Sequence, residues 1–184
     1  DDPPTRRTVP TLLLALLPAL APGLAAAPAP TPKPGDGGPA AFVAAVYRVV
    51  VSGDGDQGGQ FFWLEPEVRP GRFSSALLDL WAKADELRDE NGDGVGAIDW
   101  DPVTASQDPV VKSFTVKVER QDAKSATVAV TLVDPRGKRP VASDSVVRWD
   151  LVKEAGAWKV DDFRGSVGGR PWSVRKSLER YLEP

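Results

Sequence analysis

The chain reads FTVKVE at residues 114–119 and VAVTL at residues 128–132. In both stretches the larger apolar residues occupy every second position, which is the period of a β-strand with one buried face. The second stretch leads into Asp134-Pro135-Arg136-Gly137, a sequence typical of a tight turn. Residues 145–152 and 158–163 predict a third and a fourth strand, joined by a turn at residues 154–156.

Two helical segments precede these strands. Residues 40–51 place apolar side chains at helical spacing: Phe42, Val43, Val46, Tyr47 and Val50. A second helix begins after Ser74, a suitable N-cap, and ends at Asn91-Gly92. Phe73 is placed to pack on Leu78 across its first turn. Its predicted buried stripe is Leu77, Leu80, Trp81, Ala84 and Leu87.

Residues 172–182 predict a closing helix, and residues 60–71 an ordered loop. Helices followed by an antiparallel meander indicate an α+β domain. We expect a curved antiparallel sheet of about four strands, packed on two N-terminal helices, with a C-terminal helix.

The first 39 residues have the composition of a leader and a spacer. Arg6 and Arg7 precede an apolar run that ends in small residues, which is the layout of a secretory signal peptide. We assign residues 1–27 to this signal peptide, residues 28–39 to a disordered Pro- and Gly-rich spacer, and residues 40–184 to a single domain. The expected location is therefore periplasmic or extracellular, without a stable membrane anchor after cleavage.

The composition narrows the chemistry that the chain could perform. It has 184 residues, a net charge of −3, no cysteine and no histidine. Disulfides, thiolate nucleophiles, Ser-His-Asp triads and most zinc sites are thereby excluded. No basic stripe predicts a nucleic-acid partner.

Three stretches resemble a bacterial family of exported proteins of unknown function. They are residues 96–102 (GAIDWDP, followed by Gln107-Asp108), residues 158–163 (WKVDDF) and residues 172–178 (WSVRKSL). The resemblance implies a nuclear-transport-factor-2-like fold, a cystatin-like cone in which a curved sheet wraps over helices. It also implies a cell-envelope or secreted protein, and supplies no activity.

An acidic, glycine-rich loop follows the second predicted helix. Oxygen-bearing residues at alternate positions, with glycine at the sixth, are how an EF-hand loop begins to wrap calcium. The twelfth position, which needs a bidentate glutamate, holds Trp100. The candidate calcium ligands are Asp89, Asn91, Asp93, Val95, Asp99 and Asp101. The alternative is a solvated helix exit, followed by a loop that aspartates structure through the turn-forming pairs Asp101-Pro102 and Asp108-Pro109 and through hydrogen bonds to nearby backbone N–H groups.

Asp162 is the candidate for carboxylate chemistry. Strict alternation along the fourth strand places it on the same face as Trp158 and Val160, toward the interior. An unpaired carboxylate there could act as a general base, with Arg148 or Tyr47 assisting. The alternative is a paired acid that accepts hydrogen bonds from an arginine or from the N-terminus of the closing helix.

Aromatic residues supply the candidate binding surface. Tyr47 could line a pocket, although aromatic residues at helical spacing more often belong to the core. Phe61, Phe62 and Trp63 lie outside any clear periodicity, as an exposed patch would. With Arg148 and Asp162 they form the predicted ligand-binding set. We expect a non-catalytic binding or accessory domain for a small molecule or a protein partner. The alternatives are an enzyme that uses Asp162 and a calcium-stabilised structural module.

Calcium binding by the loop at residues 89–101 predicts a rise in melting temperature in millimolar calcium. A ligand at a hundred times its dissociation constant stabilises the folded state by about 2.7 kcal/mol. Asp93→Ala should abolish the rise. An unchanged melting temperature in calcium would identify the loop as a solvated helix exit.

Overall fold

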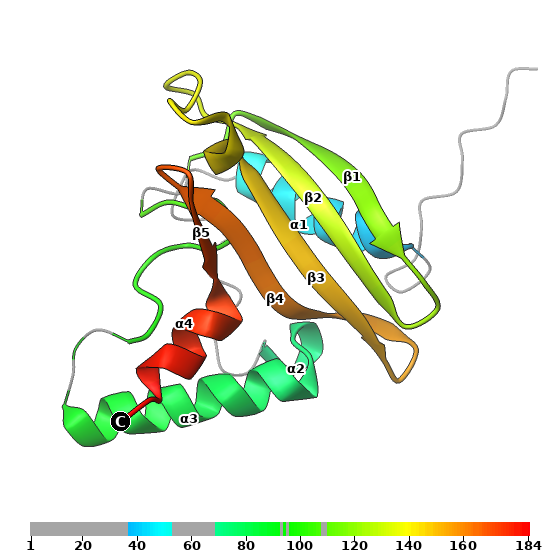
Figure 1. The fold of residues 1–184 in the computed structure, drawn as a ribbon. Helices are drawn as coiled ribbons and strands as arrows, with labels where there is room; N and C mark the ends of the chain where they lie inside the picture. Colours follow the sequence, from blue (N-terminus) through cyan, green and yellow to red (C-terminus); the bar gives the residue numbers. More distant parts are fainter. Residues whose placement is uncertain (1–36, 53–68, 93, 95, 108–109) are drawn as a thin grey trace, which may run out of the picture. The chain divides into compact units, whose positions relative to one another are not determined.

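The computed structural model describes residues 37–52, 69–92, 94, 96–107 and 110–184 (Figure 1). They form an α+β arrangement, as the sequence predicts. The helices are α1 (Pro39–Ser52), α2 (Arg69–Arg72), α3 (Ser75–Asn91) and α4 (Val174–Tyr181), with a 3₁₀ turn, η3, at Ala142–Ser145. Within the described residues, no helix has the length and apolarity needed to cross a membrane.

The sheet is an antiparallel meander in the order β1-β2-β3-β4-β5. Its strands are β1 (Ser113–Gln121), β2 (Ser125–Val133), β3 (Val146–Glu154), β4 (Ala157–Val167) and β5 (Arg170–Ser173). Helix α1 contacts β1 and β2, whereas α2, α3 and α4 contact β4 (Figure 1). The two ends of the sheet are thus covered by different helices.

The fifth strand corrects the prediction of a helix over residues 172–182. Gly168 and Gly169, with φ of 58° and 76°, form the two-residue turn between β4 and β5. Asp144 in η3 holds this turn, because its carboxylate accepts from both glycine N–H groups, at 2.7 and 3.1 Å. Trp172 therefore lies in a strand, and the closing helix begins only at Val174.

Helix α3 begins and ends where the sequence predicts. The Ser74 side chain accepts a hydrogen bond from the Leu77 N–H, and Gly92 ends the helix in the left-handed conformation. Leu77, Trp81 and Ala84 are buried, and Leu80 and Leu87 are partly exposed. Phe73 stacks on Trp81 with ring centroids 5.6 Å apart. The predicted loop at residues 60–71 ends in the single turn of α2, and residues 60–68 lie outside the described part of the chain.

One face of the sheet packs on the helices. Trp149 of β3 pairs with Val128 of β2 and Phe163 of β4, and all three side chains are fully buried. Tyr47 of α1 packs edge-on against Trp149 at 5.7 Å. Aromatic side chains from a helix and two strands thus form the centre of the core.

The opposite face, here called the outer face, carries the neighbouring residues Thr127, Arg148, Asp150, Asp162 and Arg164. The ladder pairs Asp150 with both Thr127 and Asp162, and Arg148 with Arg164. Paired residues share a face and successive residues alternate. This polar row therefore lies on the face opposite Trp149 and Phe163.

A β-bulge in β4 overturns the predicted orientation of Asp162. The ladder passes from Asp150↔Asp162 to Leu151↔Val160, so Asp161 is an extra residue of β4 with no residue opposite it in β3. Strict alternation would put Asp162 on the same face as Val160, but the extra residue moves Asp162 to the opposite face of the sheet. Val160 is in the core, and Asp162 is on the outer face.

The packing of Trp172 on Gly165 predicts that Gly165→Ala destabilises the fold. A Cβ at position 165 would lie 2.5 Å from Trp172 Cζ2. Trp172 has little room to move, because it packs on Trp100 with ring centroids 4.4 Å apart. Overpacking of this kind costs about 1–3 kcal/mol in the free energy of unfolding, measurable by urea denaturation.

Gly71→Ala is the matched control, since a Cβ there meets nothing within 4 Å. We expect it to change the stability by less than about 0.5 kcal/mol. Equal effects of the two substitutions would contradict the close approach of Trp172 to β4.

Candidate functional site

Ion pairs between different strands organise the outer face. Glu119 of β1 and Arg148 of β3 form a two-pronged pair, with N–O distances of 2.9 and 3.0 Å. Glu119 lies at a second bulge, where the β1–β2 register shifts between Val118 and Arg120. The hydrogen bond from Arg148 holds the pKa of Glu119 below its ordinary value.

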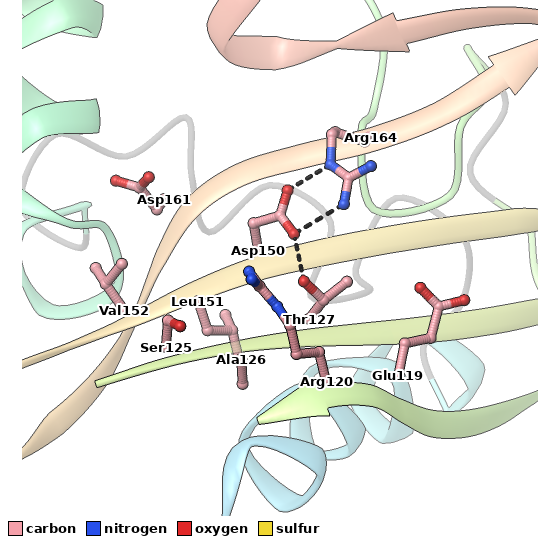
Figure 2. A pocket seen from close by; sticks show the side chains of 10 residues that line it. All are labelled: Glu119, Arg120, Ser125, Ala126, Thr127, Asp150, Leu151, Val152, Asp161 and Arg164. Carbon is pink, nitrogen blue, oxygen red and sulfur yellow. Dashed lines mark hydrogen bonds and ion pairs between the residues drawn. The ribbon is translucent and has the colours of Figure 1, made fainter. Parts of the chain in front are cut away.

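Asp150 lies at the centre of the face, between Thr127 and Arg164 (Figure 2). The Thr127 hydroxyl donates to Oδ1 at 2.8 Å, and Arg164 donates to both carboxylate oxygens. Burial raises the pKa of Asp150, but the hydrogen bonds from Arg164 and Thr127 outweigh it, and the pKa lies below its ordinary value. Asp150 is therefore ionised at neutral pH.

The two aspartates of the β4 bulge each bind the capping serine of one helix. The hydroxyl of Ser74, the N-cap of α3, donates to Asp161 Oδ1 at 2.6 Å. The hydroxyl of Ser173, the N-cap of α4, donates to Asp162 Oδ2 at 2.6 Å. Each serine oxygen also accepts from its own helix, Ser74 from the Leu77 N–H and Ser173 from the Lys176 N–H. The bulge thus fixes the starts of both helices.

Asp162 is a paired acid. It is 8% exposed, and its second oxygen accepts from the Arg175 N–H in the first turn of α4 at 2.9 Å. Burial raises the pKa of Asp162, and the hydrogen bonds from the Arg175 N–H and from Ser173 reverse the effect only in part. This geometry agrees with the second of the two sequence-based hypotheses for Asp162, in which its carboxylate accepts hydrogen bonds from the N-terminus of the closing helix.

Two cavities lie beside this row of ion pairs. The smaller has a volume of about 520 Å³ and the larger about 750 Å³, and Arg164 lines both. The smaller cavity is lined by Glu119, Asp150 and Asp161, among others. The larger is lined by Arg148, Asp162, Arg175 and residues of β5 and α4. Arg148 and Asp162, both predicted ligand-binding residues, therefore share one cavity wall.

Tyr47 belongs to the core and not to this wall. Its side chain is fully buried, its hydroxyl donates to the Val103 carbonyl at 2.6 Å, and it accepts from Trp149 Nε1 at 2.9 Å. Burial raises the pKa of Tyr47 far above its ordinary value. The structure does not bring Tyr47 together with Asp162, which faces away from Trp149. Phe61, Phe62 and Trp63 lie outside the described residues.

The candidate calcium ligands are only partly within the described chain, since Asp93 and Val95 lie outside it. The Asp89 carboxylate accepts from Arg88 at 2.8 and 3.0 Å, and Asn91 and Asp99 are exposed. Asp101 is buried, and its carboxylate accepts from the N–H groups of Val103 and Thr104 and from the Thr104 hydroxyl. Across the described positions, no group of three or more acidic side chains could hold a metal ion.

Sequence reasoning missed most of the residues around the two cavities. Glu119, Asp150 and Arg164 each follow an apolar residue in a strand, as solvated strand residues do, so the one-dimensional pattern gave no signal. Lys176 and Arg180 lie four residues apart, which places two basic side chains on one helix face. This spacing is the feature of the sequence that could have identified Lys176 and Arg180 as cavity residues.

Comparisons of the chain with protein-family models, with curated proteins and with solved structures find no match.

Asp150 and Asp162 lie opposite each other in the β3–β4 ladder, but their pKa values shift in opposite directions. Hydrogen bonds from Arg164 and Thr127 lower the pKa of Asp150, whereas burial raises that of Asp162. Asp150 releases its proton more easily in the folded state, so its contribution to stability is lost as the pH falls through its folded pKa. Asp162 holds its proton more tightly in the folded state, so stability is lost as the pH rises from the unfolded pKa through the folded one. Carbon-detected NMR titration should show Asp162 protonating at a higher pH than Asp150.

Asp150→Asn is the test of their coupling. The negative charge of Asp150 raises the pKa of Asp162, so the substitution should lower it. Ser173→Ala is the counterpart, because it removes a hydrogen bond that lowers the pKa of Asp162 and should raise it. A pKa of Asp162 below that of Asp150 in the unmodified protein would contradict the burial of Asp162.

Proposed function

We propose that the chain is an exported binding or accessory domain that acts without catalysis, and that it binds its ligand on the outer face of the sheet. The observation that carries this proposal is the pair of adjoining cavities, which share Arg164 and are lined by ion-paired side chains. Those side chains are 26–41% exposed, so solvent and ligands reach them. A site whose side chains are already held in place costs less to order on binding.

The helix-covered face offers less support for a ligand. Tyr47, Phe73, Trp149 and Phe163 are at most 1% exposed, and their rings contact one another through Trp149 and Phe163. A ligand between sheet and helices would have to displace these side chains. The cavities of the outer face require no such displacement.

The arrangement of Asp162 favours binding over catalysis. A general base needs a lone pair directed at a substrate proton. Both oxygens of Asp162 accept hydrogen bonds that hold α4 to the sheet. The raised pKa of Asp162 and its place in the wall of the larger cavity are the observations that favour the alternative, a carboxylate-based enzyme.

Membership in the exported cone family belongs to the same proposal. Its support is the order of elements, with α1 and α3 before a meander sheet, and the leader-like composition of residues 1–27. The three stretches that carry the resemblance also contact one another. Trp100 of the first packs on Trp172 of the third, and Asp162 of the second accepts from Ser173 of the third.

Ligand mapping by NMR tests the proposed function. A panel of anionic, cationic and neutral small molecules, added to the ¹⁵N-labelled full chain, should shift the backbone amides of residues 148–150 and 162–166. Amides on the buried side of α1, such as that of Val43, serve as the internal control and should not move. Shifts confined to the helices, or no shifts with any compound, would contradict a binding site on the outer face.

A further inference from the structure

The three ion pairs beside the cavities all point the same way. Their carboxylates, Glu119, Asp150 and Asp161, line the smaller cavity. The arginines that pair with them, Arg148, Arg164 and Arg175, line the larger cavity. The carboxylates of the ion pairs thus line the smaller cavity and their guanidinium groups line the larger, although Arg164 lines both and Arg120 adds a basic group to the smaller cavity.

Helix α4 adds two more cations to the larger cavity. Lys176 and Arg180 both line it, and both are exposed. Within the described part of the chain, the structure gives neither side chain a hydrogen bond or an ion pair. These two charges are therefore available to a ligand without breaking an internal contact.

The charge balance of the larger cavity is opposite to that of the whole chain. Five basic side chains line it against two acidic ones, Asp162 and Glu179, while the chain carries a net charge of −3. Asp162 accepts hydrogen bonds from the Ser173 hydroxyl and from the Arg175 N–H of α4, which offset part of its negative charge. The local field of this cavity therefore favours negative charge.

The remaining wall combines an apolar part with four serines, Ser143, Ser166, Ser173 and Ser177. Pro171, Trp172 and Gly165 line the same cavity, whose volume of about 750 Å³ lies in the range of small-molecule sites. Arg148 and Arg164 already use Nε and Nη2 in their ion pairs with Glu119 and Asp150. Their remaining N–H donors and their positive charge still attract carboxylate and phosphate. An apolar wall beside them suits the carbon frame of an organic ligand.

We propose that the larger cavity binds a small organic anion with two or more carboxylate or phosphate groups. The anion lies between the arginines of β3 and β4 and the cations Lys176 and Arg180 of α4, with its carbon frame against Trp172. This inference rests on the proposed function and specifies the ligand class for one of its two cavities.

Calorimetric titration with citrate and with inorganic pyrophosphate tests the proposal. Citrate presents carboxylates and pyrophosphate presents phosphates, so the two titrations distinguish the possible sources of negative charge. At least one should bind the full chain saturably, at constant ionic strength, and shift the amides of Gly165 and Lys176. Lys176→Ala combined with Arg180→Ala should weaken that binding at least tenfold, or by about 1.4 kcal/mol, without lowering the melting temperature.

The matched control combines Lys83→Ala with Lys138→Ala. Both lysines are exposed and lie outside the two cavities. Their substitution removes two positive charges, as many as the Lys176→Ala and Arg180→Ala variant loses. This variant should bind the anion as tightly as the unmodified protein, because its loss of charge is not local. An equal loss of affinity in both double variants would reduce the effect to net charge and overturn the proposal.

The result also separates this inference from the proposed function. Cationic or neutral compounds that shift the outer-face amides, while citrate and pyrophosphate do not, would overturn the anion site and leave the binding function standing. No shift on the outer face with any compound would overturn both. Anion binding that survives Lys176→Ala with Arg180→Ala unchanged would place the anion elsewhere and overturn the inference.

Discussion

The structure depends on the two aspartates of the β4 bulge. Asp161 and Asp162 are adjacent in the chain, and each accepts a hydrogen bond of 2.6 Å from the N-cap serine of a different helix. Arg175 strengthens the junction, because its side chain pairs with Asp161 and its N–H donates to Asp162. Without the extra residue in β4, the two carboxylates could not meet two helices while Val160 and Phe163 both remain in the core.

The same bulge determines how charge is distributed on the outer face. It turns Asp162 toward the outer face, beside Asp150. It leaves Asp161, which lines the smaller cavity, to pair with Arg175, which lines the larger. The second bulge, at Glu119, brings a carboxylate to Arg148. Bulges occur where a strand must aim a side chain that regular pairing would direct elsewhere. The Asp161–Arg175 and Glu119–Arg148 ion pairs therefore each depend on a bulge.

The sequence predicts the elements that local rules control. Ser74 and Gly92 mark the ends of α3, the turn at Asp134–Gly137 directly follows β2, and the alternation of residues 128–132 identifies β2 itself. The bulge could not be predicted, because a single extra residue leaves the apolar and polar pattern of residues 158–163 nearly unchanged. It becomes visible only through the pairing of β4 with β3, and it reverses the face assigned to Asp162.

Strand β5 and the cavity walls also could not be predicted without knowing which distant parts of the chain lie next to each other. The Gly168-Gly169 pair is a recognisable hairpin turn, but β5 has only four residues and includes Pro171. Proline is tolerated there because β5 lies at the edge of the sheet. Of the predicted ligand-binding residues, Arg148 and Asp162 share a cavity wall, and Tyr47 lies in the core, because its hydroxyl pairs with Val103 and Trp149.

A double-mutant cycle on Asp162→Ala and Ser173→Ala tests most directly whether the bulge anchors the helices. Urea unfolding of the two single variants and the double variant gives the coupling energy between the two side chains. Residues that share one hydrogen-bond network couple by about 0.5–3 kcal/mol, and we predict a value in that range. Effects that add to within about 0.3 kcal/mol would show that Asp162 and Ser173 act independently, and would contradict the account.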